Sequence, residues 1–239
     1  MTERYETTWD ESGEAGTPGM EDPPPRPDFF KRMWMVIVQP GELFRALAAN
    51  PAWFPMAAFV AVVAGVGMAV IPADAFYETI AANTPPEQMG DLRDVPAFWL
   101  KWPWVAGVAL AMLVGPVFLS LVSYVIFVFI RGDRATFKQH LCVMAHASVI
   151  SALGVLVAAP VRIGAGNVQD TLALGDLTPF LDGYLYNLLS LLDLFALWAT
   201  VVAGLGLSVI DPRRRWGTTA AVLVVIFVVM MMGLALFLP

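Results

Sequence analysis

Two polar residues inside long apolar stretches are the side chains best placed to do chemistry. Asp193 stands in Leu-Leu-Asp-Leu-Phe, and His146 stands in Met-Ala-His-Ala-Ser. A carboxylate inside a membrane helix costs about 2.5–3.5 kcal/mol on insertion scales, so Asp193 must face a helix interface, a cavity or a partner. The residue is either a proton or cation site or the acceptor of an interhelical hydrogen bond. We favour the hydrogen bond, because one acid without a second intramembrane charge makes a poor relay.

The candidate hydrogen-bond partners of Asp193 lie on the two preceding apolar stretches and are His146, Ser148, Ser151, Ser120, Ser123 and Tyr124. For His146 itself, a neutral imidazole bonded within the bundle is favoured over a ligand role. His140 lies six positions earlier, on another helix face, and is expected at the interface. The sequence contains neither an HExxH motif nor a Cys/His cluster nor a nucleophile motif. We therefore expect no metal, no cofactor and no enzymatic activity.

Composition identifies the class of protein that positions these residues. The 239 residues are 58% hydrophobic and 14% charged, with a mean hydropathy of +0.69, which is typical of an integral membrane protein. The net charge of -6 comes entirely from residues 1–28, which are acidic and rich in proline. Such a segment buries too little apolar surface to fold, so we expect a disordered cytoplasmic tail. No basic tract suits nucleic acid.

The rest of the chain predicts an all-α fold with five transmembrane helices in a membrane domain over residues 51–239. Each apolar stretch is long enough for about 30 Å of hydrocarbon. The expected spans are residues 53–71, 103–130, 140–161, 184–210 and 216–238. Small residues recur every four positions in the first, second and fourth spans, which favours close helix packing there. Gly115-Pro116 predicts a kink in the second span.

Basic residues predict the orientation of these spans. Outside the tail of residues 1–28, nine Lys and Arg residues fall before the first span and in the two loops that follow the second and fourth spans; they are Lys31, Arg32, Arg45, Arg131, Arg134, Lys138, Arg213, Arg214 and Arg215. The other two loops carry only Arg93, Lys101 and Arg162, among many acids. The positive-inside rule therefore places the N-terminus in the cytoplasm and the C-terminus outside.

Residues 29–50 predict two short amphipathic helices that lie in the headgroup region. Apolar residues recur at helical spacing from Phe30 to Ile37, and Pro40 restarts a second helix with Glu42 in its first turn. Neither piece is long enough to span. We expect lipid contact through Lys31, Arg32, Trp34 and Arg45. The alternative is a cytosolic cap docked on the bundle.

Three segments resemble motifs of bacterial members of the Yip (Ypt/Rab-interacting protein) domain family. Residues 36–44, with Pro40, Glu42 and Phe44, resemble the motif before the first span. Residues 132–139, with Phe137 and Lys138, resemble the turn after the second span, and residues 192–198, with Phe195 and Trp198, resemble the fourth-span signature. The resemblance implies a five-span helical domain with a cytoplasmic N-terminus, in a bacterial inner membrane. Eukaryotic relatives act in vesicle trafficking and bind Rab-type GTPases, but the Asp-Leu-Tyr-Gly-Pro motif is absent, so no such partner is expected.

Two functions follow as expectations. The first is a non-enzymatic inner-membrane protein that organises membrane or protein partners, with a trafficking or membrane-homeostasis role implied by the resemblance. Its partners would be the lipid bilayer, another membrane protein or further copies of the chain. The alternative is a small transporter or channel that uses Asp193 and His146 within the bundle.

Overall fold

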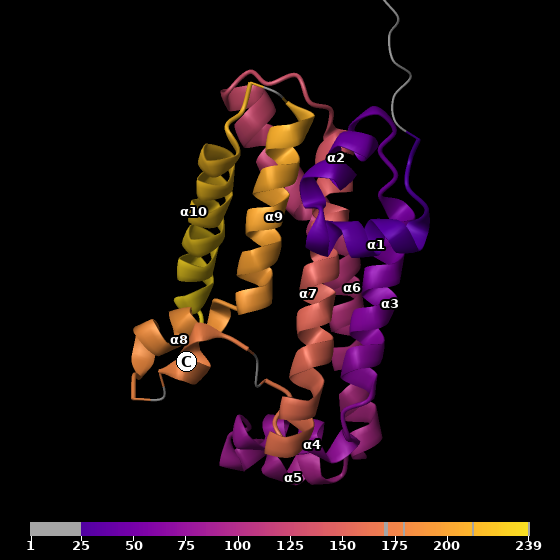
Figure 1. The fold of residues 1–239 in the computed structure, drawn as a ribbon. Coiled ribbons are helices and arrows are strands. Elements are labelled where there is room, and N and C mark those ends of the chain that lie inside the picture. The colour runs from indigo at the N-terminus through magenta and orange to yellow at the C-terminus, as the bar shows by residue number, and fades with distance from the viewer. Residues whose placement is uncertain (1–24, 170–171, 179, 212, 239) are drawn as a thin grey trace, which may run out of the picture.

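The computed structural model describes residues 25–169, 172–178, 180–211 and 213–238, with the side chains of Asp91 and Arg93 left aside. The predicted tail, residues 1–28, falls almost wholly outside this part of the chain. The architecture is helical, as predicted. Five long helices run alternately in opposite directions (Figure 1); they are α3 (Phe54–Ala69), α6 (Ala97–Tyr124), α7 (Phe137–Ala165), α9 (Leu194–Ile210) and α10 (Trp216–Ala235).

Length and composition support three or four membrane spans among the described residues. α6 continues through a π-helical turn, η2 (Val125–Ile130), and this unit, α7 and α10 are each long and apolar enough to cross. α3 reaches that length only together with α4 (Ala73–Ala82), at a bend of 81°. α9 has 17 residues and falls just short. The membrane character is therefore confirmed, and the count of five spans stays a prediction.

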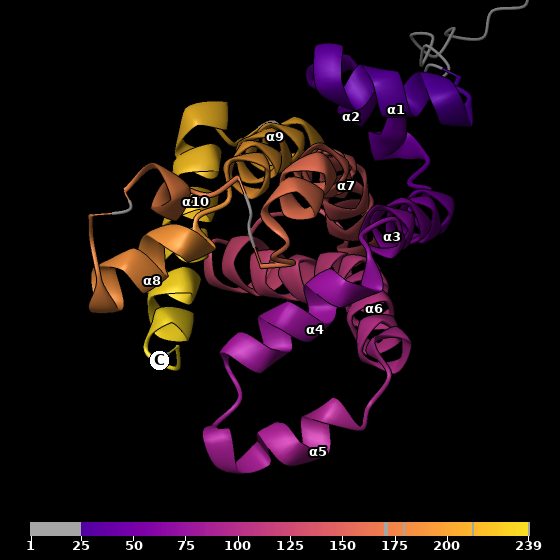
Figure 2. The ribbon, with the colours of Figure 1, turned by 90° about the horizontal axis from the view of Figure 1, so that it is seen from below.

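α7 is the central helix of the bundle. Within its most apolar window 67% of the residues are buried, against 22% for α6 and for α10. α7 packs on α3, α6 and α9, while α10 packs mainly on α9 (Figure 2). α10 therefore lies at the periphery of the bundle.

Glycines at several helix contacts explain how closely the helices approach. A Cβ on Gly154 of α7 would lie 2.7 Å from Phe195 of α9, and one on Gly204 of α9 would meet the backbone of Ala220 in α10. Gly204 belongs to the four-spaced small residues of the fourth span, and in the first span Ala57, Ala61 and Gly65 are buried, so both sets mark packing faces. Those of the second span do not, because Gly107 and Gly115 have open space where a side chain would be.

Two short helices pack against the side of the bundle near one end (Figure 2). α1 (Phe29–Val38) begins where the Asp28 carboxylate accepts a hydrogen bond from the Lys31 N–H at 2.8 Å. α2 (Pro40–Ala49) begins with proline at its first position and packs on α9 and α7. α1 lies across the bundle axis (Figure 1), and the interfacial position of the two helices stays a prediction.

The opposite end holds helices that the sequence analysis treated as loop, namely α4, the short helix η1 (Pro86–Gln88) and α5 (Met89–Arg93). The Lys101 ammonium group closes this end of α3. It donates to the carbonyl oxygens of Ala69 at 2.5 Å and of Ile71 at 2.7 Å. A cation there satisfies carbonyl groups that a helix C-terminus leaves open.

The prediction of one helix over residues 184–210 is wrong. The chain forms α8 (Gly183–Leu191), breaks at Leu192 and Asp193, and resumes as α9. At the break, Leu174 N–H donates to Leu192 C=O and Leu194 N–H donates to Leu172 C=O, both at 3.1 Å. This bridge replaces the helical hydrogen bonds that the break removes, next to the short helix η3 (Leu174–Leu177).

Candidate functional site

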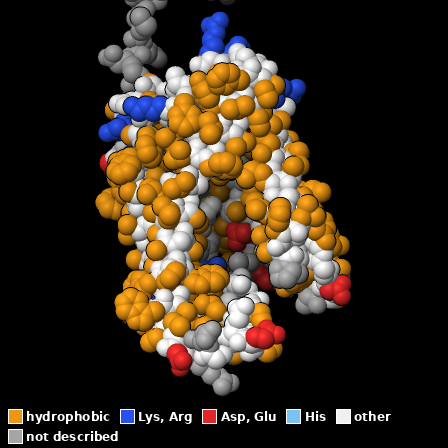
Figure 3. Space-filling model, turned by 180° about the vertical axis from the view of Figure 1, so that it is seen from behind, with side chains coloured by type: hydrophobic (Ala, Val, Ile, Leu, Met, Phe, Trp, Pro, Cys, Tyr) orange, Lys and Arg blue, Asp and Glu red, His pale blue; other side chains and the backbone are white. Residues whose placement is uncertain are grey.

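The candidate site is a cavity of about 360 Å³ between α6, α7, α9 and α10. α6 packs on α3 and α7, whereas α10 packs on α9 and α8, so the two outer helices leave a gap in front of α7. Most of the lining side chains are apolar or small, such as Ala111, Met112, Ala147 and Phe227. Figure 3 shows the hollow surrounded by apolar side chains, with acidic and basic groups in its lower part.

The cavity is long and runs parallel to the helix axes. Its lining residues on α7 extend from Met144 to Arg162. At 1.5 Å per residue this stretch covers about 27 Å, close to the thickness of the hydrocarbon core. Charge is found at one end only, where Arg162 and Asp193 are the charged members of the lining.

Asp193 occupies the N-cap of α9 at the helix break. Its Oδ1 accepts the Ala196 N–H at 2.8 Å, so its hydrogen bond is to its own helix and not to another span. The predicted interhelical bond to His146 or a serine is therefore wrong. The positive end of the α9 dipole stabilises the carboxylate in this position. Asp193 is half-buried and faces the cavity.

Arg162 is the charged residue that the sequence analysis assigned to a loop. It lies inside α7, which continues to Ala165 and ends at Gly166 with a left-handed φ of 68°. The side chain is buried, and its Nη1 lies 3.3 Å from the Met68 sulfur on α3. A basic residue in the last turn of α7 favours that helix terminus. The predicted third span ended at residue 161, directly before Arg162, whereas α7 continues to Ala165. The adjacency of Arg162 to the predicted span end was the sequence signal that could have placed it in the helix.

His146 lies outside this cavity. Its Nδ1 donates to the Cys142 carbonyl at 2.8 Å, and its Nε2 is buried with no partner among the described residues. The structure shows the hydrogen bond within the bundle and does not bring His146 together with Asp193; the neutral state stays a prediction. His140, expected at the interface, is fully buried, with Nδ1 2.9 Å from the Ser123 hydroxyl.

The predicted lipid-contact residues divide into two groups. Lys31, Trp34 and Arg45 are exposed. Arg32 is not: it is buried and donates to the Ala52 carbonyl, so its assignment to lipid contact is wrong. The guanidinium instead fixes the segment between α2 and α3, because a buried cation needs an acceptor.

The family-motif residues lie at several places in the bundle, some buried and some exposed. Pro40 starts α2, Phe44 is fully buried, and Glu42 is exposed in the first turn. Phe137 contacts Tyr124 edge-on, with 5.7 Å between ring centroids. The remaining three are Lys138, which is exposed, Phe195, which fills the space beside Gly154, and Trp198, which is 38% exposed.

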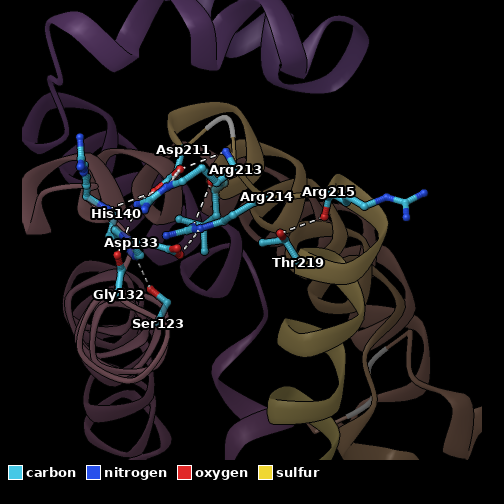
Figure 4. Close-up of polar contacts among 11 residues, drawn as sticks. Ser123, Gly132, Asp133, His140, Asp211, Arg213, Arg214, Arg215 and Thr219 are labelled. Atoms are coloured by element: carbon cyan, nitrogen blue, oxygen red, sulfur yellow. Dashed lines mark hydrogen bonds and ion pairs between the residues drawn. The ribbon is translucent and has the colours of Figure 1, made fainter.

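A second polar group, here named the loop cluster, comprises Asp133, Asp211, Arg213 and Arg214 (Figure 4). It joins the loop after η2 to the loop after α9. Arg214 pairs with Asp133 at 2.5 Å, donates to the Leu207 carbonyl at 3.0 Å and lies 4.4 Å from the Phe127 ring centroid. The sequence analysis explained these arginines by orientation alone and missed their structural role.

Asp211 is the acidic centre of the other half of the loop cluster. It accepts hydrogen bonds from the Arg213 side chain at 2.9 and 3.1 Å and from the Arg134 N–H at 3.0 Å. These donors, Arg213 first, hold the pKa of Asp211 well below its usual range. Burial lowers the pKa of Arg214, and Asp133 opposes that lowering.

The comparisons with known proteins identify one family. The family model described as the Yip1 domain matches residues 34–237. No curated protein and no solved structure matches the chain significantly. The matched range contains the cavity, the loop cluster and the second half of α1.

Proposed function

The chain belongs to the Yip1 domain family of multi-pass membrane proteins, and we propose that it is a non-enzymatic protein of the bacterial inner membrane that organises membrane or protein partners. The role is of the trafficking or membrane-homeostasis type that the family resemblance implies. One observation carries the proposal, namely the two apolar faces of α1.

One face of α1 is packed and the other is free. Met35 and Val36 are buried against the bundle, whereas Phe30, Trp34 and Val38 are 76%, 65% and 46% exposed. The exposed three are four residues apart and therefore form one stripe along the helix. Lys31 is exposed nearby. A rigidly docked helix with an aromatic stripe and a cation suits the headgroup region or the apolar face of a partner.

The distribution of charge supports an inside orientation for this helix. The exposed Lys and Arg side chains gather at the end of the molecule that carries the loop cluster, and acidic groups gather at the opposite end (Figure 3). The positive-inside rule would place α1 and the loop cluster at the cytoplasmic surface.

The test is extraction in native lipid nanodiscs followed by mass spectrometry of what co-purifies. We expect a stoichiometric protein partner that is lost in Phe30→Ala/Trp34→Ala/Val38→Ala. The matched control is Val225→Ala/Val229→Ala/Met232→Ala, three exposed apolar residues of α10. An unchanged co-purified set in the α1 variant, or a defined turnover by the purified protein, would refute the proposal.

The helix break favours transport as a second candidate function. Unwound backbone at membrane depth beside a carboxylate is a feature of ion and substrate sites in transporters. Here Asp193 supplies the carboxylate, and the cavity supplies the space. In proteoliposomes, Asp193→Asn should abolish flux while the folded level is retained, because asparagine still caps α9. If the unaltered protein carries no ion or solute flux across the proteoliposome membrane, transport is excluded.

A further inference from the structure

We propose that the cavity binds one phospholipid whose headgroup carries both a phosphate and an amine, with an acyl chain lying along α7. The phosphate would pair with Arg162 and the amine with Asp193. This inference concerns a site on the far side of α7 from α1 and does not depend on the function proposed for α1.

The shape and lining of the cavity fit an acyl chain. The lining over about 27 Å of α7 exceeds the roughly 15 Å that one leaflet of hydrocarbon contributes. Apolar and small side chains from four helices form it, including Ala111 and Gly115 of α6 and Leu223 and Phe227 of α10. Such a surface gains nothing from water, and an apolar chain covers it favourably.

The volume of the cavity fits a small molecule or one acyl chain. It is about 360 Å³, which lies in the range of small-molecule sites, roughly 300–1,000 Å³. The rest of the lipid would lie in the bilayer beside α6 and α10.

The charged end of the cavity selects the headgroup. A guanidinium group presents several N–H donors in one plane and pairs with phosphate oxygens through two parallel hydrogen bonds. The Asp193 carboxylate uses Oδ1 for the helix cap, and its Oδ2 accepts no hydrogen bond from the described residues. It can therefore accept from an ammonium group. Both signs of charge at one end match a zwitterion better than an anionic headgroup.

The surroundings of the cavity favour entry from the bilayer. The hollow lies on a face covered by apolar side chains, as Figure 3 shows. Exposed residues on the outer helices include Leu119 and Leu121 on α6 and Val225 and Val229 on α10, each at least 41% exposed. A lipid reaches such an opening by lateral diffusion, whereas a water-soluble ligand would have to cross this surface.

The experiment is native mass spectrometry of the full chain after reconstitution with equal amounts of phosphatidylethanolamine and phosphatidylglycerol. We expect the protein to retain one phosphatidylethanolamine with at least tenfold preference. Gly115→Leu should lower that retention at least tenfold, because the new side chain enters the cavity. Gly107→Leu is the matched control: it is on the same helix, has equally open space, and does not line the cavity.

Two further variants test the headgroup contacts. Asp193→Asn should abolish the preference for phosphatidylethanolamine while the lipid stays bound, since the cap survives and only the charge is lost. Arg162→Gln should lower the retention of both lipids, and Arg162→Lys should restore part of it.

Three results would overturn the proposal. They are equal retention by Gly115→Leu and Gly107→Leu, no headgroup preference in the unaltered protein, and recovery of the unaltered protein without lipid. The α1 variant Phe30→Ala/Trp34→Ala/Val38→Ala should still retain the lipid. Failure of the α1 proposal and failure of this one are therefore distinguishable.

Discussion

Replacing Arg214 with methionine should destabilise the bundle far more than replacing its neighbour Arg215. The Arg214 side chain is 2% exposed and its partner Asp133 is 10% exposed, so the substitution leaves a buried carboxylate without its cation. Breaking a buried pair from one side costs about 3–5 kcal/mol. The lost contact with the Phe127 ring adds about 0.5–2 kcal/mol.

Arg215 is the matched control because both substitutions remove one positive charge from the same loop. Arg215 is exposed, and its side chain makes none of the contacts of the loop cluster. An effect on membrane orientation should therefore be equal in the two variants, whereas an effect on packing should appear only in Arg214→Met. Surface charges of this kind contribute about 0–1 kcal/mol.

The assay is the unfolding midpoint of each purified variant in mixed detergent micelles, with the free energy taken from the fitted transition. A double-mutant cycle with Asp133→Asn isolates the pair, because the double variant buries no unpaired charge. We expect the double variant to be more stable than the sum of the single losses predicts. Equal free energies of unfolding for Arg214→Met and Arg215→Met would refute the assignment of Arg214 to the folded core.

Three further predictions concern other parts of the structure. Because the pKa of Asp211 is depressed in the folded state, its contribution to stability is present above the unfolded pKa of about 3.9 and is lost as pH falls below it; Asp211→Asn should flatten that part of a stability–pH profile. Lys101→Met should cost about 2–3 kcal/mol in unfolding free energy, since two carbonyls lose a charged donor, and Lys101→Arg should recover part of it. Gly204→Ala should cost about 1–3 kcal/mol in the same assay, because the new methyl group meets the Ala220 backbone, whereas Gly233→Ala should be neutral or stabilise the helix by up to about 1 kcal/mol.

The helical class and the order of long helices could be predicted because apolar length is a property of the sequence alone. α7 and α10 lie where the third and fifth spans were expected, and α6 with η2 contains the second. Helix starts were also readable, as Pro40 shows for α2. Apolar length and helix starts depend on nearby residues and on the surrounding lipid or water. They do not depend on contacts between distant segments.

The candidate site could be predicted only in part, because its geometry depends on contacts between distant segments. Asp193 was recognised as unusual, but its helix break is stabilised by backbone bonds from residues 172–174, about twenty positions away. Arg162 and Arg214 were counted as loop charges, since charge alone does not show burial. His146 was recognised correctly as a hydrogen-bonded core residue.

The bridge at the break between α8 and α9 has a consequence for the order of assembly. Residues 183–210 are apolar enough to enter the bilayer as one unbroken helix, in which every backbone group is satisfied internally. Unwinding at Leu192 and Asp193 becomes favourable only when Leu172 and Leu174 are present to exchange hydrogen bonds. We therefore expect insertion to come first and unwinding second. The break between α8 and α9 would then form after membrane insertion, when residues 172–174 pack beside it.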